Sequence, residues 1–297
     1  MSYSTNLNEQ DIKKIIAKYK EFELPLTNNY TLFRAKYKSC TMTIFKTNTI
    51  LFQGINEMEV SKEVCALANI EVNHEKTTNS SLSINLSLIG TDEVGTGDFF
   101  GGIVVAASYI PKEQIPVLRR LGVKDSKELT DEKILEIAPI LIEKIKHSVH
   151  LLDNMKYNYV TKVKNMNMNK IKAVLHNSAI RHLKQKIEDY DGIIIDAFTP
   201  QDKYFDYLKD EVNVERDVEL IEKAESKYIC VATSSIIARY VFLKHMDELS
   251  KNVGFELPKG AGNKVDLAIQ KILKTKPIKY LDNIAKTNFK NLEKATK

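Results

Sequence analysis

The stretch GTDEVGTGDFFGG, residues 90–102, organises the rest of the sequence. It holds five of the 11 glycines in the chain, interleaved with three carboxylates, of which Asp92 and Glu93 come first. Mainly apolar residues precede it at 86–89 and follow it at 103–107, and such runs bounded by glycine are typical of buried strands. Glycine permits backbone conformations that other residues resist. The stretch therefore predicts a strand that ends in acidic residues, a tight turn and a return strand.

Two further carboxylates stand in a similar context. Asp196 follows three isoleucines of a predicted buried strand, at the strand end where α/β sheets place their chemistry. Glu225 lies just before a long predicted helix. The simpler alternatives are a polar turn for Asp92 and Glu93, a strand-end cap for Asp196 and a favourable helix-dipole charge for Glu225. Adjacent strand residues face opposite ways, so Asp92 and Glu93 can share a site only where the strand bends.

Carboxylates beside buried strands favour a divalent cation, because unpaired buried charges are costly. Oxygen-only ligand sets suit Mg²⁺ or Mn²⁺, and the six histidines and three cysteines show no convincing zinc spacing. The G-x-S-x-G motif of serine hydrolases is absent from the sequence. Carboxylate-bound metals are suited to in-line displacement at phosphodiesters.

The composition is that of an ordinary soluble protein, with 43% hydrophobic and 28% charged residues. A length of 297 residues allows one large or two modest domains. We expect no membrane association, because no segment approaches the roughly 20 apolar residues of a span. The N-terminal residues lack the features of a secretory signal, and the three scattered cysteines indicate a reducing, cytoplasmic location. The net charge of +5 is a weak indication of a polyanionic partner.

Residues 1–80 are predicted to form a separate small domain. A helix is expected over 11–21, three strands within 30–53 and a second helix over 56–70, in the order α-β-β-β-α. The polar residues 71–85 are interpreted as a linker.

Three basic residues of this domain, Arg34, Lys36 and Lys38, are two positions apart. In a strand they would point to one face, which could contact phosphates or could equally be a solvated outer face.

Residues 86–297 are predicted to form the main domain, in which strands alternate with helices, as in an α/β sheet packed by helices. Thr130 is the expected N-cap of a helix that runs to about Lys146. Further helices are expected over 111–121, 154–187 and within 226–250, further strands over 148–152, 193–198 and 218–221, and two helical stretches interrupted near Pro277 at the C-terminus. Lys286, Lys290 and Lys294 have the spacing of one helix face, either a basic surface or a solvated one.

Four segments resemble the signatures of type 2 ribonucleases H, in the same order along residues 86–297. They are GTDEVGTGDFFGG, GVKDSKELT, IIIDAFTP and KAESKYICVATSSIIAR. Two features are similar to the bacterial ribonuclease HIII branch: Gly95-Thr96-Gly97, where ribonuclease HII typically has Gly-Arg-Gly, and Glu225, where it usually has Asp. The N-terminal domain also fits, since ribonuclease HIII enzymes carry a small domain resembling half of a TATA-binding protein.

The resemblance implies a ribonuclease H-like mixed sheet flanked by helices, and an endonuclease that cuts the RNA strand of RNA/DNA hybrids to leave 5′-phosphate and 3′-hydroxyl ends. It implies that Asp92, Glu93, Asp196 and Glu225 are both catalytic and metal-binding, with Mg²⁺ or Mn²⁺ as the cofactor.

The resemblance also implies substrate-binding residues. The backbone of Gly95, Thr96 and Gly97 would approach the minor groove, where 2′-hydroxyls distinguish RNA from DNA. Lys124, Ser126 and Lys127 would contact phosphates, unless they merely form a loop that leads into a helix. The basic face of Arg34, Lys36 and Lys38 would add sequence-independent affinity.

Other functions stay open at this point. One is cleavage at single embedded ribonucleotides, as in ribonuclease HII, and another is hybrid binding without catalysis, which would leave the four carboxylates unexplained. G-T-D-x-x-G-T-G is also loosely similar to the phosphate loop of actin-like sugar kinases, but the second Asp-Gly-Gly motif that they need is absent. We expect a monomer without a small organic cofactor.

Overall fold

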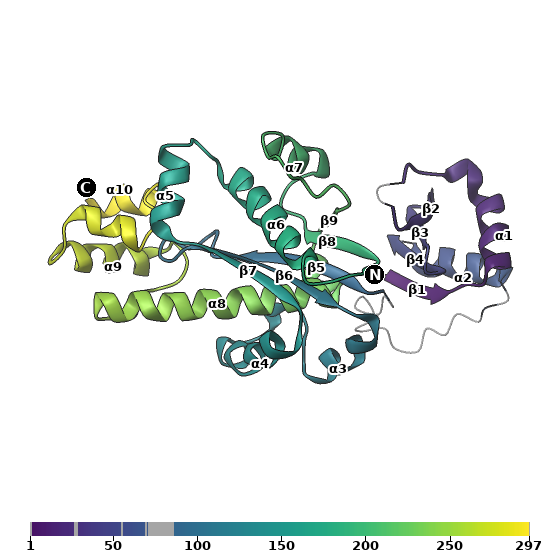
Figure 1. Cartoon of the computed structure of the whole chain (residues 1–297), viewed down its shortest axis with the longest axis horizontal. Coiled ribbons are helices and arrows are strands. Elements are labelled where there is room, and N and C mark those ends of the chain that lie inside the picture. Colours follow the sequence, from purple (N-terminus) through teal and green to yellow (C-terminus); the bar gives the residue numbers. More distant parts are fainter. Residues whose placement is uncertain (1, 27–28, 55, 69, 71–85, 297) are drawn as a thin grey trace.

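The computed structural model describes residues 2–26, 29–54, 56–68, 70 and 86–296. The described residues form two separate sheets, a four-stranded antiparallel sheet near the N-terminus and a five-stranded mixed sheet in the main domain (Figure 1). The linker predicted at 71–85 lies outside the described residues.

The N-terminal sheet has the strand order β1-β4-β3-β2 and buries one face against two helices. The buried face includes Phe33, Met42 and Phe52, which pack with Ile15 and Val60 of the helices. The elements are β1 (Ser2–Asn6), α1 (Glu9–Tyr19), a 3-10 turn (Lys20–Phe22), β2 (Thr31–Tyr37), β3 (Cys40–Phe45), β4 (Thr49–Gly54) and α2 (Glu57–Leu67). The predicted helices and three strands are confirmed, whereas β1 was not predicted.

The main sheet has the order β7-β6-β5-β8-β9. β5, β6 and β7 pair antiparallel, and β8 and β9 run parallel to β5, which makes the sheet mixed. The strands are β5 (Leu88–Val94), β6 (Ile103–Ile110), β7 (His147–Leu152), β8 (Gly192–Asp196) and β9 (Glu219–Ile221).

Helices cover both faces of this sheet, as Figure 1 shows, with α6 on one face and α4 and α8 on the other. The α-helices are α3 (Ile115–Arg120), α4 (Asp131–Lys144), α5 (Asn154–Lys162), α6 (Met168–Lys184), α7 (Gln201–Tyr207), α8 (Ile229–Val253), α9 (Asn263–Leu273) and α10 (Lys290–Thr296). Short 3-10 turns span Lys112–Gln114, Ser126–Glu128, Ala224–Ser226 and Ile278–Asn283. The predicted cap of α4 is confirmed, since the Lys133 amide donates to Thr130 Oγ1.

α8 crosses β5 at a very short distance. A Cβ added to Gly90 would lie 2.3 Å from the backbone nitrogen of Val231, and Ser234 Oγ donates to the Gly90 carbonyl at 2.8 Å. Small side chains on the first turns of α8, including Ala232 and Ser235, accompany this approach.

Two predictions are wrong. The single helix expected over 154–187 is divided into α5 and α6, because Asn165 adopts a left-handed conformation (φ 50°) and Asn167 caps a new helix. Lys286, Lys290 and Lys294 do not share a helix face, because α10 begins only at Lys290 and Lys286 is fully buried.

The predicted basic face of the N-terminal sheet is also wrong in part. Arg34 and Lys36 lie in β2, but Lys38 lies in the following turn with φ 45°. The Lys38 ammonium forms ion pairs with Glu59 and Glu63 of α2 instead of joining the strand face.

The two domains touch through the sheet face that α1 and α2 leave open. Tyr30, Phe45 and Leu51 are buried with the core of the main domain. The Tyr30 hydroxyl donates to Glu219 at 3.2 Å, and a Cβ on Gly192 would lie 2.5 Å from the Tyr30 ring. The centre of this face is therefore covered, while Lys36 at the edge strand remains exposed.

Candidate active site

The parallel pair β5 and β8 brings three of the predicted carboxylates to one edge of the sheet. Thr91 pairs with Ile195, so Asp92, Glu93 and Asp196 follow at the carboxyl ends of adjacent strands. Glu225 comes from the 3-10 turn just before α8, and the neighbouring Ala224 amide donates to Asp196 Oδ1 at 2.6 Å. These four residues, called the carboxylate site below, lie together although they are up to 133 positions apart in the sequence (225 − 92).

Asp92 carries the least compensated charge of the carboxylate site. Burial raises the pKa of Asp92 well above its usual value, and the charges of Glu93, Asp196 and Glu225 raise it further, against a hydrogen bond from Ser235. Burial likewise raises the pKa of Asp196, with Glu225 and Glu93 adding to the shift. Such a concentration of negative charge favours a cation.

Glu93 is held by two residues of α6 that sequence reasoning missed. Lys172 Nζ lies 2.6 Å from one carboxylate oxygen and His176 Nε2 lies 2.9 Å from the other. His176 Nδ1 lies 2.6 Å from the Thr91 hydroxyl, and Phe198 stacks on the imidazole. Burial raises the pKa of Glu93, but His176 and Lys172 outweigh it and hold this pKa below its usual value. The one available signal was the i, i+4 spacing of Lys172 and His176 on a helix.

Glu225 is held from the other side by two predicted substrate-binding residues, Ser126 and Lys127, and by Ser235 of α8, which the sequence analysis missed. Ser126 and Ser235 donate to Glu225 Oε2 at 3.3 and 3.1 Å, and their hydroxyls lie 2.7 Å apart. Lys127 forms an ion pair with the other oxygen, Oε1. Glu225 is buried, whereas the Lys127 side chain is 78% exposed. Ser126 is thus a buried support, and Lys127 can leave Glu225 without unpacking the core.

The turn of Gly95, Thr96 and Gly97, called the glycine turn below, needs its two glycines for different reasons. Gly95 has φ 96°, and an added Cβ would lie 2.4 Å from the Gly102 carbonyl oxygen. At Gly97 an added Cβ would meet nothing within 4 Å. The first glycine is therefore required by the fold, whereas the second leaves open space above the backbone.

The remaining predicted residues lie away from the carboxylate site. Lys124 pairs with Glu128 at 3.2 Å on the surface. The N-terminal domain with Arg34, Lys36 and Lys38 contacts the opposite end of β8, at Gly192, which is about 13 Å from Asp196 along the strand.

The donor chemistry of the carboxylate site fits a hard divalent cation such as Mg²⁺ or Mn²⁺. Within the part of the chain that the structure describes, no three His, Cys, Asp or Glu side chains already converge on one point. The reason is that Glu93 faces Lys172 and His176, and Glu225 faces Lys127. A groove of about 660 Å³ adjoins the site, with Asp196, Lys127, Phe198 and Lys223 among its lining residues.

The chain is similar to known proteins over nearly its whole length. The family model of ribonuclease HII matches residues 89–292, and a domain of unknown function, DUF3378, matches residues 4–78. A ribonuclease HIII of Streptococcus mutans is 41% identical over 296 residues, which cover 99% of this chain and 97% of the relative. The chain belongs to the ribonuclease HIII family. A family member from Staphylococcus aureus is also 41% identical, over 89% of this chain and 88% of its own length.

A solved family structure, Bst-RNase HIII in complex with Mn²⁺, aligns with a TM-score of 0.69 and 39% identity, covering 100% of this chain and 98% of that one. The predicted ribonuclease H-like mixed sheet with a small preceding α+β domain is thereby confirmed, and family membership makes the chain a ribonuclease H, a hydrolase. Among the described residues, no helix is both long and apolar enough to span a bilayer.

Proposed function

We propose that this chain is an endonuclease that hydrolyses the RNA strand of RNA/DNA hybrids, using Mg²⁺ or Mn²⁺ held by Asp92, Glu93, Asp196 and Glu225. The observation that carries the proposal is the gathering of four carboxylates at one edge of the sheet, with Asp92 and Glu225 buried among them. The manganese complex of a ribonuclease HIII supports the choice of metal. Membership of the ribonuclease HIII branch does not favour cleavage at single ribonucleotides, and four carboxylates gathered at one edge of the sheet do not favour hybrid binding without catalysis.

The residues around the carboxylate site have distinct roles in the proposed reaction. Asp92, Glu93, Asp196 and Glu225 would hold the divalent cation, which would supply the Lewis acidity for in-line hydrolysis that leaves 5′-phosphate and 3′-hydroxyl ends. Ser126 and Ser235 orient Glu225, while Lys172 and His176 orient Glu93. Lys127 pairs with Glu225 in the free protein and turns to a substrate phosphate when Glu225 is needed as a ligand.

The glycine turn supplies the proposed selectivity for RNA. Its open space at Gly97 lets the backbone approach the minor groove and the 2′-hydroxyls. Gly97→Ala should therefore fold normally and yet raise KM for the hybrid, because the new methyl group occupies space meant for substrate. Gly95→Ala is the matched control for a fold defect, and it should lower the melting temperature. An unchanged KM in Gly97→Ala would remove the turn from the binding surface.

We further propose that residues 1–80 are a substrate-binding domain similar to half of a TATA-binding protein, and that the enzyme is a cytoplasmic monomer. Lys36, on the exposed edge strand β2, is the residue best placed to meet a phosphate. Lys36→Glu should weaken hybrid binding. The slope of log affinity against log salt concentration should become shallower by about one. Lys62→Glu, on the helix that covers the opposite sheet face, is the matched control and should change neither.

The deciding experiment uses three labelled duplexes with Mg²⁺ or Mn²⁺: an RNA/DNA hybrid, a DNA duplex with one ribonucleotide, and double-stranded RNA. Cleavage of the hybrid by the wild type, lost in Asp92→Asn, is the expected result. Efficient cutting at the single ribonucleotide would indicate the ribonuclease HII specificity. Binding without any cleavage would leave a hybrid-binding protein.

A further inference from the structure

Lys286 is a buried lysine that the proposed mechanism does not use. It lies between the 3-10 turn Ile278–Asn283 and α10, and none of its surface is exposed. Burial lowers the pKa of Lys286 to about 7, with the charge of Asp98 acting in the opposite direction. Burying an amine is costly unless its hydrogen bonds are satisfied, so the contacts of this group show what it stabilises.

The Lys286 amine donates to two carbonyl oxygens, and both belong to the segment that follows the glycine turn. Lys286 Nζ donates to the Asp98 carbonyl oxygen at 2.7 Å and to the Gly101 carbonyl oxygen at 2.5 Å. Asn154, at the start of α5, donates to the same Gly101 oxygen at 2.8 Å. One amine thus spans the segment 98–101 from its first carbonyl to its last.

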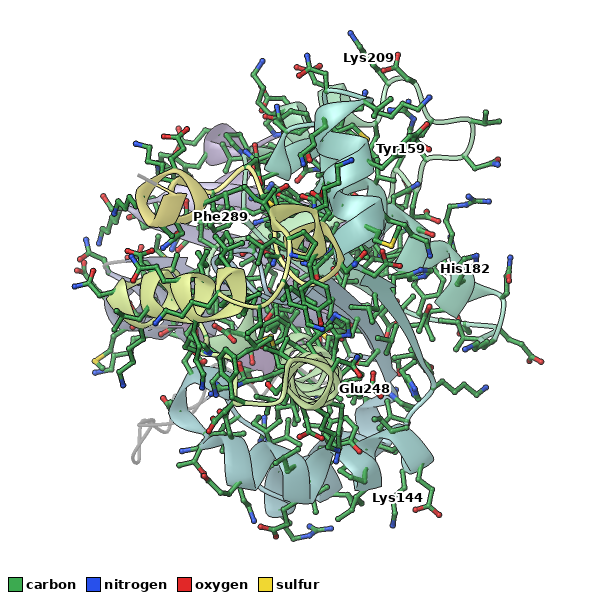
Figure 2. All side chains as sticks on the ribbon, turned by 90° about the vertical axis from the view of Figure 1, so that its left-hand side faces the viewer. Lys144, Tyr159, His182, Lys209, Glu248 and Phe289 are labelled. Atoms are coloured by element: carbon green, nitrogen blue, oxygen red, sulfur yellow. The ribbon has the colours of Figure 1, made fainter. Side chains whose placement is uncertain are left out.

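The backbone reinforces this connection. The Lys286 amide donates to the Phe99 carbonyl at 2.8 Å, and the Gly101 amide donates to the Ile284 carbonyl at 3.0 Å. Figure 2 shows the C-terminal segment with Phe289 and helix α5 with Tyr159 at the same end of the molecule, near the end of α8 at Glu248. The exit of the glycine turn is therefore fixed to the C-terminal segment, whereas its entrance is fixed by β5.

We propose that Lys286 is a positioning residue for substrate recognition, which sets the glycine turn through the carbonyls of Asp98 and Gly101. The proposal rests on the proposed function, because the turn is taken to meet the 2′-hydroxyls of the RNA strand. Lys286 itself contacts no substrate. Its loss leaves two buried carbonyl oxygens with fewer donors, and the segment that carries the turn is then free to shift.

The test measures selectivity, which a purely structural role would not change. Hybrid and DNA-duplex affinities are compared by fluorescence anisotropy, in the Asp92→Asn background that prevents cleavage. Lys286→Met keeps the volume and removes the donors, and it should weaken hybrid binding by about tenfold, the equivalent of one well-placed hydrogen bond. Binding of the DNA duplex should stay within about twofold.

Two matched variants separate the hydrogen bonds that the Lys286 amine donates from other effects of the substitution. Lys286→Arg keeps donors to the carbonyls and should recover part of the lost selectivity. Lys290→Met, an exposed lysine four residues further, should leave selectivity unchanged. Full selectivity in Lys286→Met, or an equal loss of hybrid and DNA binding, would overturn the proposal.

Hydrogen exchange provides a readout independent of binding. The amides of Phe99 and Gly101 should exchange faster in Lys286→Met than in the wild type, because their segment loses its anchor. If Lys286→Met does not fold, Asn154→Ala decides, since it removes the other donor to the Gly101 oxygen. In Asn154→Ala we expect selectivity to fall about threefold, which is about half the free-energy change of a tenfold loss. That result would support the anchoring of segment 98–101, and unchanged selectivity would contradict it. Wild-type protein that does not cleave the hybrid would instead contradict the proposed function.

Discussion

Both ends of the β5–β8 pair lie beside carboxylates, and each end neutralises them in a different way. At the carboxyl end, Glu225 is paired with Lys127, whose side chain is 78% exposed and can move away. At the amino end, Gly192 contacts Tyr30, whose hydroxyl donates to Glu219. An exposed lysine can be exchanged for a metal ion, whereas an aromatic hydroxyl packed against the backbone cannot. One end is thus suited to chemistry and the other to holding two domains together.

The largest expected effect comes from removing charge at the carboxyl end. Loss of a residue that merely supports a metal ligand costs about 10- to 100-fold in activity, so Asp92→Asn should lose more than about a hundredfold. Stability should change in the opposite direction. Because the pKa of Asp92 is raised in the folded state, the folded state keeps the Asp92 proton to a higher pH than the unfolded state does. Wild-type stability therefore falls as pH rises from the unfolded pKa of Asp92 through its folded pKa. At pH 7 without metal, Asp92→Asn should melt at a higher temperature, and a lower one would contradict the raised pKa.

The supports of Glu93 should give the next largest effect. Lys172→Met and His176→Gln should each lower cleavage by about 10- to 100-fold, and the Mg²⁺ concentration for half-maximal activity should rise. The physical reason is that Glu93 loses one of the two partners that orient its carboxylate. His182→Gln is the control, since His182 is an exposed residue of the same helix α6, labelled in Figure 2. Equal loss in all three variants would indicate a general defect of the helix.

At the amino end, the expected effect is on stability. A Cβ at Gly192 would lie 2.5 Å from the Tyr30 ring, so Gly192→Ala should cost about 1–3 kcal/mol of unfolding free energy. The kcat on a short hybrid should stay close to that of the wild type, because the substitution is remote from the carboxylate site. Urea unfolding and single-turnover cleavage measure the two quantities. A large loss of kcat would show that the domain contact supports catalysis.

The smallest effect concerns pH. Burial raises the pKa of Glu219 above its usual value, against the charge of Arg34 and the hydrogen bond from Tyr30. The folded state therefore binds more protons than the unfolded state above pH 4.5, and wild-type stability falls as pH rises through the folded pKa. Glu219→Gln removes this dependence. Its melting temperature relative to the wild type should rise from pH 4.5 towards pH 7, and a constant difference would disprove the linkage.

The sequence predicted the residues that act through local context. Asp92, Glu93 and Asp196 end strands of apolar residues, and the parallel arrangement of those strands brings them together. It did not reveal residues whose importance depends on distant partners. His176 lies 83 positions from Glu93, and Lys286 lies 185 positions from Gly101.

Local sequence patterns also gave wrong predictions where the backbone conformation depends on a single residue or on a distant partner. β1 is the polar segment SYSTN, which has no apolar alternation and forms a strand by pairing with β4. A single asparagine, Asn165, interrupts the periodicity that predicted one long helix. Lys286 continued a helical spacing of lysines, but the segment that contains it is drawn into the core by its backbone bonds to Phe99 and Gly101.

The close crossing of α8 over β5 has a consequence for the evolution of the family. Gly90 contacts no substrate in the proposed mechanism, but any larger residue would collide with the backbone of α8 at Cys230 and Val231. Shape alone therefore excludes substitution at this position, as strictly as the proposed chemistry would exclude it at Asp92. Among descendants of this sequence, an invariant Gly90 would record the clearance between a helix and a strand rather than a part in catalysis.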